Sequence, residues 1–200
     1  PQPFRLSIRA GTFAVVDYGA EDRVVPGVDH ATVVRSTNGV PVVAERVTTH
    51  AGEPGAPDDD TDDEEGDGDG EDSAGGDIAV GPGAVVAATR WAFPSSLGTD
   101  AAEVRIVAFN PDPEHSVRVA LLTVANGGKT EVDGAHGVEV PPGGRVALHD
   151  RAHGVAWVVE AETPVVVERM VMGEGGLALA AGVGIPSVDG SVSLDRSGER

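Results

Sequence analysis

The chain contains no cysteine, a single lysine and few aromatic residues. Without cysteine it forms neither a disulfide nor a thiolate metal site, and this absence fits a reducing cytosol as well as an exported protein. Only four Phe, two Trp and one Tyr are present among 200 residues. We therefore expect a hydrophobic core built mainly from Val, Leu, Ile and Ala.

Long apolar runs are also missing. The sequence has no stretch of about 20 apolar residues, the length that crosses a membrane as a helix. Residues 1–5 lack the basic-then-apolar pattern of an export signal. We expect any membrane attachment to depend on a segment outside this chain.

Basic charge is scarce: 14 Lys and Arg residues stand against 33 Asp and Glu, which gives a net charge of −19. Binding to nucleic acid or to anionic lipid depends on Lys and Arg neutralising phosphates. The sequence therefore argues against a nucleic-acid partner. It leaves a protein or a cell-wall component as the partner class, and it does not fix the oligomeric state.

Most of the negative charge lies in one segment. Residues 58–72 hold 11 carboxylates, which repel one another and cannot bury an apolar core, so we expect a disordered insertion over about residues 53–82. The alternative is calcium, which prefers oxygen ligands, but the glycine at the sixth position of an ordered calcium loop is absent. Only weak calcium binding is expected, with the candidate ligands Asp58, Asp60, Asp62, Asp67 and Asp69.

Signatures of catalysis are absent as well. The sequence has no Gly-x-Ser-x-Gly elbow, no phosphate-binding glycine loop and no dinucleotide fingerprint. His149 and His153 have the spacing of two metal ligands on a helix, but a turn fits this glycine-ended stretch better. Trp91 and Trp157 are candidates for sugar stacking, although packing between sheets is favoured. We expect a non-catalytic protein with no cofactor beyond weakly bound calcium.

Strand signals run through the rest of the chain. Residues 104–109, 117–122 and 154–167 are rich in β-branched side chains and are separated by Gly, Pro, Asn and Asp. No convincing helical period occurs. Short strands at a spacing of about ten residues predict an all-β sandwich.

An internal repeat divides the chain. Residues 41–46, Pro-Val-Val-Ala-Glu-Arg, recur as residues 164–169, Pro-Val-Val-Val-Glu-Arg. We therefore predict two tandem Ig-like β-sandwich units, with boundaries at residues 1–94 and 95–187 and a flexible tail at 188–200. The other matched segments, in the same order in both copies, are 8–18 with 140–150, 31–34 with 156–159, and 86–95 with 178–187.

The first unit is expected to be incomplete. It has no counterpart of residues 104–109 and 117–124, so it lacks its opening strands or is completed by a partner chain. The distance from Arg46 to Pro94 is 48 residues, whereas the matching distance in the second unit is 17. This excess indicates that the acidic segment is a long loop inserted between two strands of the first unit.

The repeated Glu-Arg pairs suggest an acid beside a base. Neighbours along a strand point to opposite faces, so neither Glu45 with Arg46 nor Glu168 with Arg169 forms a site by itself. We expect one member of each pair to bond to a nearby loop and the other to face solvent. The pairs are interpreted as structural.

Four motifs resemble an actinobacterial family of domain-of-unknown-function proteins: Arg-Trp-Ala-Phe-Pro at 90–94, Ala-Phe-Asn-Pro at 108–111, Val-Pro-Pro-Gly-Gly-Arg-Val at 140–146 and the Glu-Arg strand at 164–169. The resemblance implies tandem β-sandwiches that are exported or anchored by an N-terminal segment, with no catalytic residues. Ala92 departs from the aromatic residue usual there. The motif positions in this chain are Trp91, Pro94, Asn110, Pro111, Glu45, Arg46, Glu168 and Arg169.

These features indicate a non-catalytic scaffold or interaction module of the cell envelope or the extracellular space. The expected anchor is an N-terminal segment absent from this chain. The alternative is a calcium-dependent carbohydrate or cell-wall binding module, in which the acidic segment would hold the metal.

Overall fold

The computed structural model describes the chain at residues 3–25, 30–50, 77–95, 103–150, 155–173 and 176–185. Internal contacts divide the chain into two units, Pro1–Thr32 and Val33–Arg200. All strands of the described residues lie in the second unit, Val33–Arg200.

Strands dominate the described residues, which confirms the predicted all-β class. The predicted strands at residues 104–109 and 117–122 are found as β4 and β5. The strands are β1 (Glu45–His50), β2 (Asp77–Pro82), β3 (Ala88–Phe93), β4 (Glu103–Phe109), β5 (Val117–Ala125), β6 (Gly128–Glu131), β7 (Val138–Val140), β8 (Arg145–Asp150), β9 (Ala156–Gly173), β10 (Gly176–Ala181) and β11 (Val183–Ile185).

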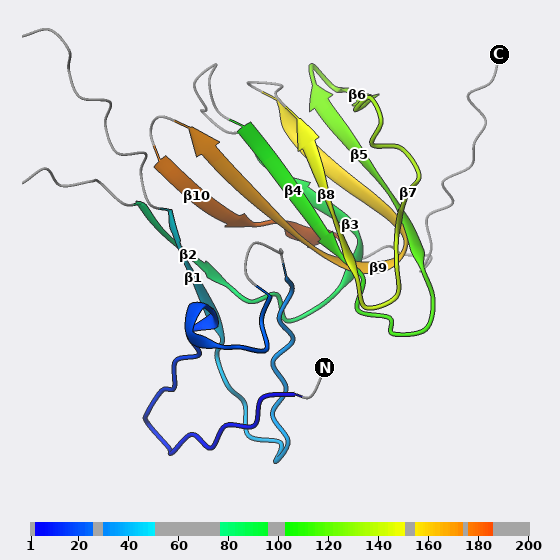
Figure 1. Ribbon diagram of the computed structural model, residues 1–200. Helices are drawn as coiled ribbons and strands as arrows, with labels where there is room; N and C mark the ends of the chain where they lie inside the picture. The colour runs from blue at the N-terminus through cyan, green and yellow to red at the C-terminus, as the bar shows by residue number, and fades with distance from the viewer. Residues whose placement is uncertain are drawn as a thin grey trace, which may run out of the picture. The chain divides into compact units, whose positions relative to one another are not determined.

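Two antiparallel sheets that share β9 form a sandwich-like fold (Figure 1). The first sheet has the order β11-β3-β9-β5, with β6 and β7 both paired to β5. The second sheet has the order β10-β9-β4-β8. The division into two tandem Ig-like units at residue 94 stays a prediction; in the structure β3, on one side of that boundary, pairs with β9 on the other.

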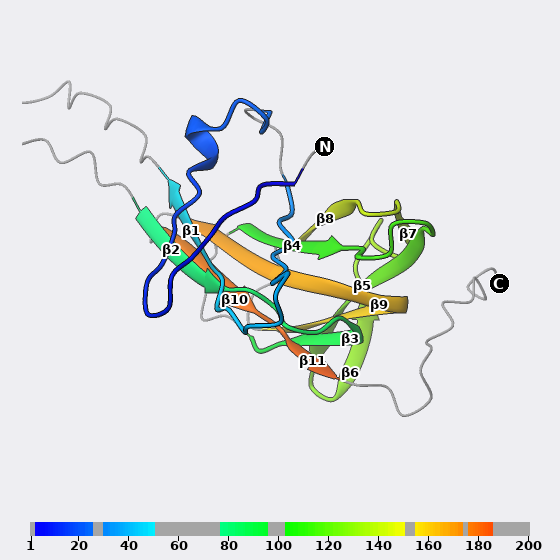
Figure 2. The same cartoon turned by 90° about the horizontal axis from the view of Figure 1, so that it is seen from below.

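β9 joins both sheets because it is 18 residues long. In its first half Val159 lies opposite Trp91 of β3, and in its second half Arg169 lies opposite Ile106 of β4. Pro164 lies near the changeover, where the lack of an N–H removes one ladder hydrogen bond. Figure 2 shows β9 as one continuous strand running past β4, β5 and β3.

The core lies between the two sheets, and β4 shows the alternation of buried and less buried residues most clearly. In β4 the side chains of Val104, Ile106 and Ala108 are buried, and the residues between them are half-buried. The core is mainly aliphatic, as the composition predicts. Its other buried members are Ala88, Trp91, Phe93, Val117, Val119, Leu121, Ala135, Val140, Leu148, Trp157, Val159, Ala161, Val165 and Val167.

The strand predicted at residues 41–46 is only partly formed. β1 begins at Glu45, and residues 41–44 are irregular, although the Ala44 carbonyl accepts a hydrogen bond from the Gly83 N–H at 3.0 Å. The matching residues 164–169 lie entirely within β9. The difference follows from pairing, because β9 has neighbours on both edges and β1, among the described residues, pairs with β2 alone.

The acidic insertion falls between β1 and β2, which pair with each other. The predicted insertion ended at residue 82, but residues 77–82 form β2, so the prediction was too long by one strand. Ladder pairing with β1 and packing against β10 hold these residues: Ala79 is buried, and Gly81 lies against Leu179. Residues 51–76 and the predicted tail at 188–200 lie outside the described residues.

Pro1–Thr32 contains one 3₁₀ turn, η1 (Tyr18–Ala20), and no strand among its described residues. Asp17 caps this turn by accepting a hydrogen bond from the Gly19 N–H at 2.9 Å. The Tyr18 hydroxyl hydrogen-bonds the Thr32 hydroxyl at 2.8 Å, and its ring meets His30 edge-on with centroids 4.6 Å apart. Local polar contacts therefore organise this unit.

Candidate functional site

Arg169 is a buried charge in the sandwich. Its side chain is 8% exposed, and its Nη1 donates to the Pro94 carbonyl at 2.7 Å. The guanidinium carbon lies 5.8 Å from the Phe93 ring centroid and 5.6 Å from that of Trp157, within range of cation–π attraction. Burial lowers the pKa of Arg169 below its usual range. Arg169 therefore fixes the chain after β3, as expected for the Glu-Arg member that bonds to a loop.

Neither tryptophan presents its ring to a ligand. Trp91 is 3% exposed and Trp157 is fully buried. The Trp91 Nε1 donates to the carbonyls of Val165 at 2.9 Å and Ala88 at 3.2 Å, and the Trp157 Nε1 donates to the Asp150 carboxylate at 2.8 Å. Packing between the sheets, with satisfied indole donors, is therefore the role of both side chains, and sugar stacking on them is excluded.

The Asn110–Pro111 motif connects two loops through hydrogen bonds of the Asn110 side chain. Asn110 is fully buried, and its Nδ2 donates to the carbonyls of His115 at 2.8 Å, Pro141 at 3.2 Å and Val140 at 3.3 Å. Its main-chain N–H donates to the Gly144 carbonyl at 2.9 Å. One side-chain amide thus joins the loop after β4 to the end of β7 and the loop that follows it.

Asp112 organises the same loop. Its carboxylate accepts hydrogen bonds from the main-chain N–H groups of Glu114 at 2.8 Å and His115 at 3.1 Å. These bonds, to Glu114 first, hold the pKa of the Asp112 carboxyl below its ordinary value. Its own N–H donates to the Asn110 Oδ1 at 3.0 Å, so the two side chains form one network.

The Pro-Pro-Gly-Gly segment forms a turn, and the segment aligned with it in the predicted repeat forms a turn of the same kind. The Gly144 N–H donates to the Pro141 carbonyl at 3.0 Å, and Gly143 has φ +60°. In Pro1–Thr32 the Thr12 N–H donates to the Arg9 carbonyl at 3.1 Å, with Gly11 at φ +72°. A positive φ at the third turn residue explains the glycine in both places.

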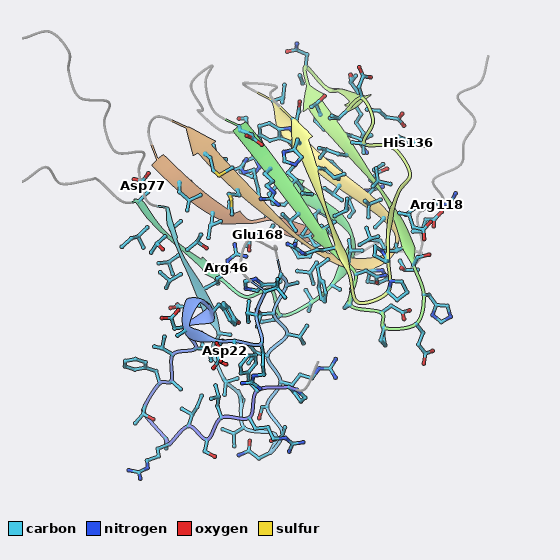
Figure 3. All side chains as sticks on the ribbon, viewed as in Figure 1. Asp22, Arg46, Asp77, Arg118, His136 and Glu168 are labelled. Atoms are coloured by element: carbon cyan, nitrogen blue, oxygen red, sulfur yellow. The ribbon has the colours of Figure 1, made fainter. Side chains whose placement is uncertain are left out.

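The first Glu-Arg pair contacts the second. Arg46 of β1 forms an ion pair with Glu168 of β9, and the two side chains are 41% and 30% exposed (Figure 3). Glu45 is exposed on the opposite side of β1. The sequence places these residues on equivalent strands but gives no signal that one motif binds the other across 122 positions.

The solvent face of the first sheet carries a network of ion pairs. Glu160 of β9 accepts from Lys129 at 2.9 Å and from Arg90 at 3.2 Å, and Arg118 pairs with Glu162 at 2.6 Å. The Glu162 carboxylate raises the pKa of Arg118. Arg90 and Arg118 lie in β3 and β5, the strands on either side of β9, and Lys129 lies in β6, so these ion pairs connect four strands of the sheet.

A metal centre finds no support in the described ranges, which contain no group of three or more His, Asp or Glu side chains able to hold an ion. His149 lies in β8, and its Nδ1 bonds the Glu103 carboxylate at 2.8 Å. A strand instead of a helix at this position removes the i, i+4 geometry. His153 and the calcium candidates Asp58, Asp60, Asp62, Asp67 and Asp69 lie outside the described residues.

The described part of the chain contains no helix long and apolar enough to cross a membrane. Three motif side chains, those of Trp91, Asn110 and Arg169, donate to main-chain carbonyls of the same fold. No protein-family model, curated protein or solved structure matches this chain.

Proposed function

We propose that the chain is a non-catalytic β-sandwich scaffold or interaction module of the cell envelope or the extracellular space. The observation that supports this most is how the motif residues are used. Trp91, Asn110 and Arg169 are all buried and donate to carbonyls of their own fold. Buried side chains that bond to their own fold stabilise it and present no reactive group to a substrate.

The partner class follows from charge. An acidic chain of net charge −19 avoids polyanions, so a protein is the better partner than nucleic acid or an anionic lipid surface. The envelope location rests on the resemblance of the motifs at 90–94, 108–111, 140–146 and 164–169.

The test is retention of the purified chain on isolated actinobacterial cell-wall material. We expect retention on wall that keeps its proteins, unchanged by a calcium chelator, and loss of retention after the wall has been treated with protease. Absence of retention on the wall that keeps its proteins would contradict an envelope role.

The same experiment separates the calcium-dependent wall binder. That function requires retention on protein-free wall in calcium and release by the chelator. A chain lacking residues 51–76 is the matched control, because it removes the candidate ligands Asp58, Asp60, Asp62, Asp67 and Asp69.

A further inference from the structure

Two hairpins of Val33–Arg200 have the same pairing. In the first, β1 pairs with β2, and Glu45 lies opposite Pro82. In the second, the last part of β9 pairs with β10, and Glu168 lies opposite Ala181. Each ladder contains six residue pairs starting from the repeated glutamate. The hairpins therefore share the Glu-Arg motif and the same register from its glutamate.

The other edges of these hairpins differ. The second half of β9 is covered by β4, with Glu168 opposite Val107 and Arg169 opposite Ile106. Among the described residues β1 pairs with β2 alone, so its far edge carries no ladder. An edge of this kind presents a row of N–H and C=O groups to an incoming strand.

The pairing also fixes which groups face the open edge. The Gly83 N–H donates to the Ala44 carbonyl, and in an antiparallel ladder hydrogen-bonded pairs alternate with non-bonded ones. Arg46 and Thr48 therefore bond toward β2, while Glu45, Val47 and Thr49 direct their main-chain groups outward. The Val47 side chain is 62% exposed, which leaves that stretch accessible.

The hairpin is held firmly on its other side. β2 packs against β10: Ala79 is buried, and Gly81 lies against Leu179. Arg46 reaches Glu168 on the same side. Because the inner face and the β2 edge are anchored to the sandwich, the open edge of β1 is presented as a preformed template, which lowers the ordering cost of binding.

We propose that the open edge of β1 binds an extended strand of a partner protein, antiparallel to β1 and in the register that β4 has on β9. This inference rests on the proposed interaction role and names its site and occupant. The partner strand carries Val, Ile or Ala at alternate positions, as β4 does at Val104, Ile106 and Ala108. Main-chain hydrogen bonds supply the affinity, as in other cases of strand addition.

Charge specifies one end of the partner strand. An antiparallel strand begins beside the end of β1 at His50, and the 12 carboxylates of residues 51–76 follow directly in the sequence. Basic residues just before the partner strand would therefore complement the charge of this acidic sequence. The β4 of a second copy does not supply such a strand, because it is already paired on both edges, with β8 and β9.

The test uses a peptide with the sequence of residues 103–110, Glu-Val-Arg-Ile-Val-Ala-Phe-Asn, preceded by two lysines, added to the full chain. Amide hydrogen exchange is followed by NMR. We expect the amides of Glu45, Val47 and Thr49 to exchange at least about tenfold more slowly with the peptide, because they gain ladder hydrogen bonds. A scrambled peptide of the same composition should protect none of them.

The matched chain variant is Val47→Pro. It removes an N–H that faces the open edge and leaves the bonds to β2, a position at which an edge strand tolerates proline. Protection of Glu45 and Thr49 should disappear, while slow exchange of the Ala79 and Gly81 amides verifies that the hairpin is intact. If the hairpin of this variant opens, a peptide N-methylated at alternate residues is used with the native chain. It lacks the N–H groups that would bond to β1, so it should protect none of the three amides.

Three results would overturn the proposal. One is no protection of the three amides by the peptide; another is equal protection in Val47→Pro. The third is protection without peptide that rises with chain concentration together with a doubled mass, since the occupant would then be a second copy. Retention on protein-bearing wall combined with any of these results would reject the edge site and leave the proposed function standing.

Discussion

The two Glu-Arg hairpins carry the same motif in different surroundings. Arg169 is buried, bonds to the Pro94 carbonyl and lies near Trp157, whereas Arg46 is 41% exposed and pairs with Glu168. Both strands begin the ladder with Glu-Arg and have the same hairpin register from that glutamate. What differs is the neighbouring strand β4, which covers β9 and has no counterpart on β1 among the described residues. The neighbour therefore decides the role of the motif.

The largest contrast is expected from removing the two arginines separately. Arg169→Ala should lower the free energy of unfolding by about 2–4 kcal/mol, because it leaves a cavity and an unpaired carbonyl. Arg46→Ala should cost at most about 1 kcal/mol, as for an exposed ion pair. Urea unfolding followed by tryptophan fluorescence measures both, since Trp91 and Trp157 lie in the sandwich core.

Arg169→Met is the control for the first of these variants, since it keeps most of the side-chain volume and removes the charge. Arg169→Met should restore the part of the unfolding free energy that Arg169→Ala loses to the cavity. It should not restore the part that comes from the hydrogen bond to the Pro94 carbonyl. Equal costs for Arg169→Ala and Arg46→Ala would show that the motif, and not its surroundings, sets the contribution.

The links of the two hairpins offer the next contrast. Residues 51–76 connect β1 to β2, whereas residues 174–175 connect β9 to β10. Replacing residues 51–76 by Glu-Gly, the sequence of residues 174–175, should stabilise the β1–β2 hairpin by ~2 kcal/mol, because the closed loop is shorter. Removing 12 carboxylates should also weaken the dependence of stability on salt.

Hydrogen exchange of the Ala79 and Gly81 amides, in low and high salt, measures both effects of the replacement. In the native chain added salt should slow exchange, because it screens the repulsion among the carboxylates. Faster exchange in the shortened chain would mean that residues 51–76 stabilise the hairpin, contrary to this expectation.

A smaller effect is expected from the contact between the hairpins. A double-mutant cycle of Arg46→Ala and Glu168→Ala should give a coupling of about 0.5–1 kcal/mol that falls as salt is raised, because both side chains are partly exposed. Arg118→Ala with Glu162→Ala, an ion pair on the first sheet, is the reference cycle. Coupling that is insensitive to salt would indicate a contact shielded from solvent.

The sequence predicted the elements of the fold better than their pairing. β4 and β5 were found from β-branched residues and turn signals, which are local properties. The sharing of β9 between two sheets and the contact of Arg46 with Glu168 were not found, because both depend on residues far apart in the chain. Residues 41–44 are strand-like in sequence, but a strand forms only where a partner supplies the ladder.

The candidate site shows the same limit. The sequence identified Trp91, Asn110 and Arg169 as structural positions, which stays an interpretation; in the structure all three side chains are buried. The sequence allowed completion of the first unit by a partner chain, but it did not identify β1 as the strand with the open edge, since an edge is defined by the absence of a neighbouring strand. The only signal was indirect: the first copy has no counterpart of residues 104–109.

The smallest expected effect concerns the loop that follows β4, the strand that distinguishes the two hairpins. The Glu114 and His115 N–H groups lower the pKa of Asp112, so the charged carboxylate stabilises the folded state. This contribution is complete above the pKa of the unfolded carboxyl, near 4, and is lost as the pH falls through the lower folded value. Unfolding free energies of the native chain and of Asp112→Asn should therefore converge below about pH 4 and separate above it. Curves that stay parallel from pH 6 to pH 2 would show that the loop after β4 does not depend on this charge, and that β4 holds its place on β9 through the ladder and the core alone.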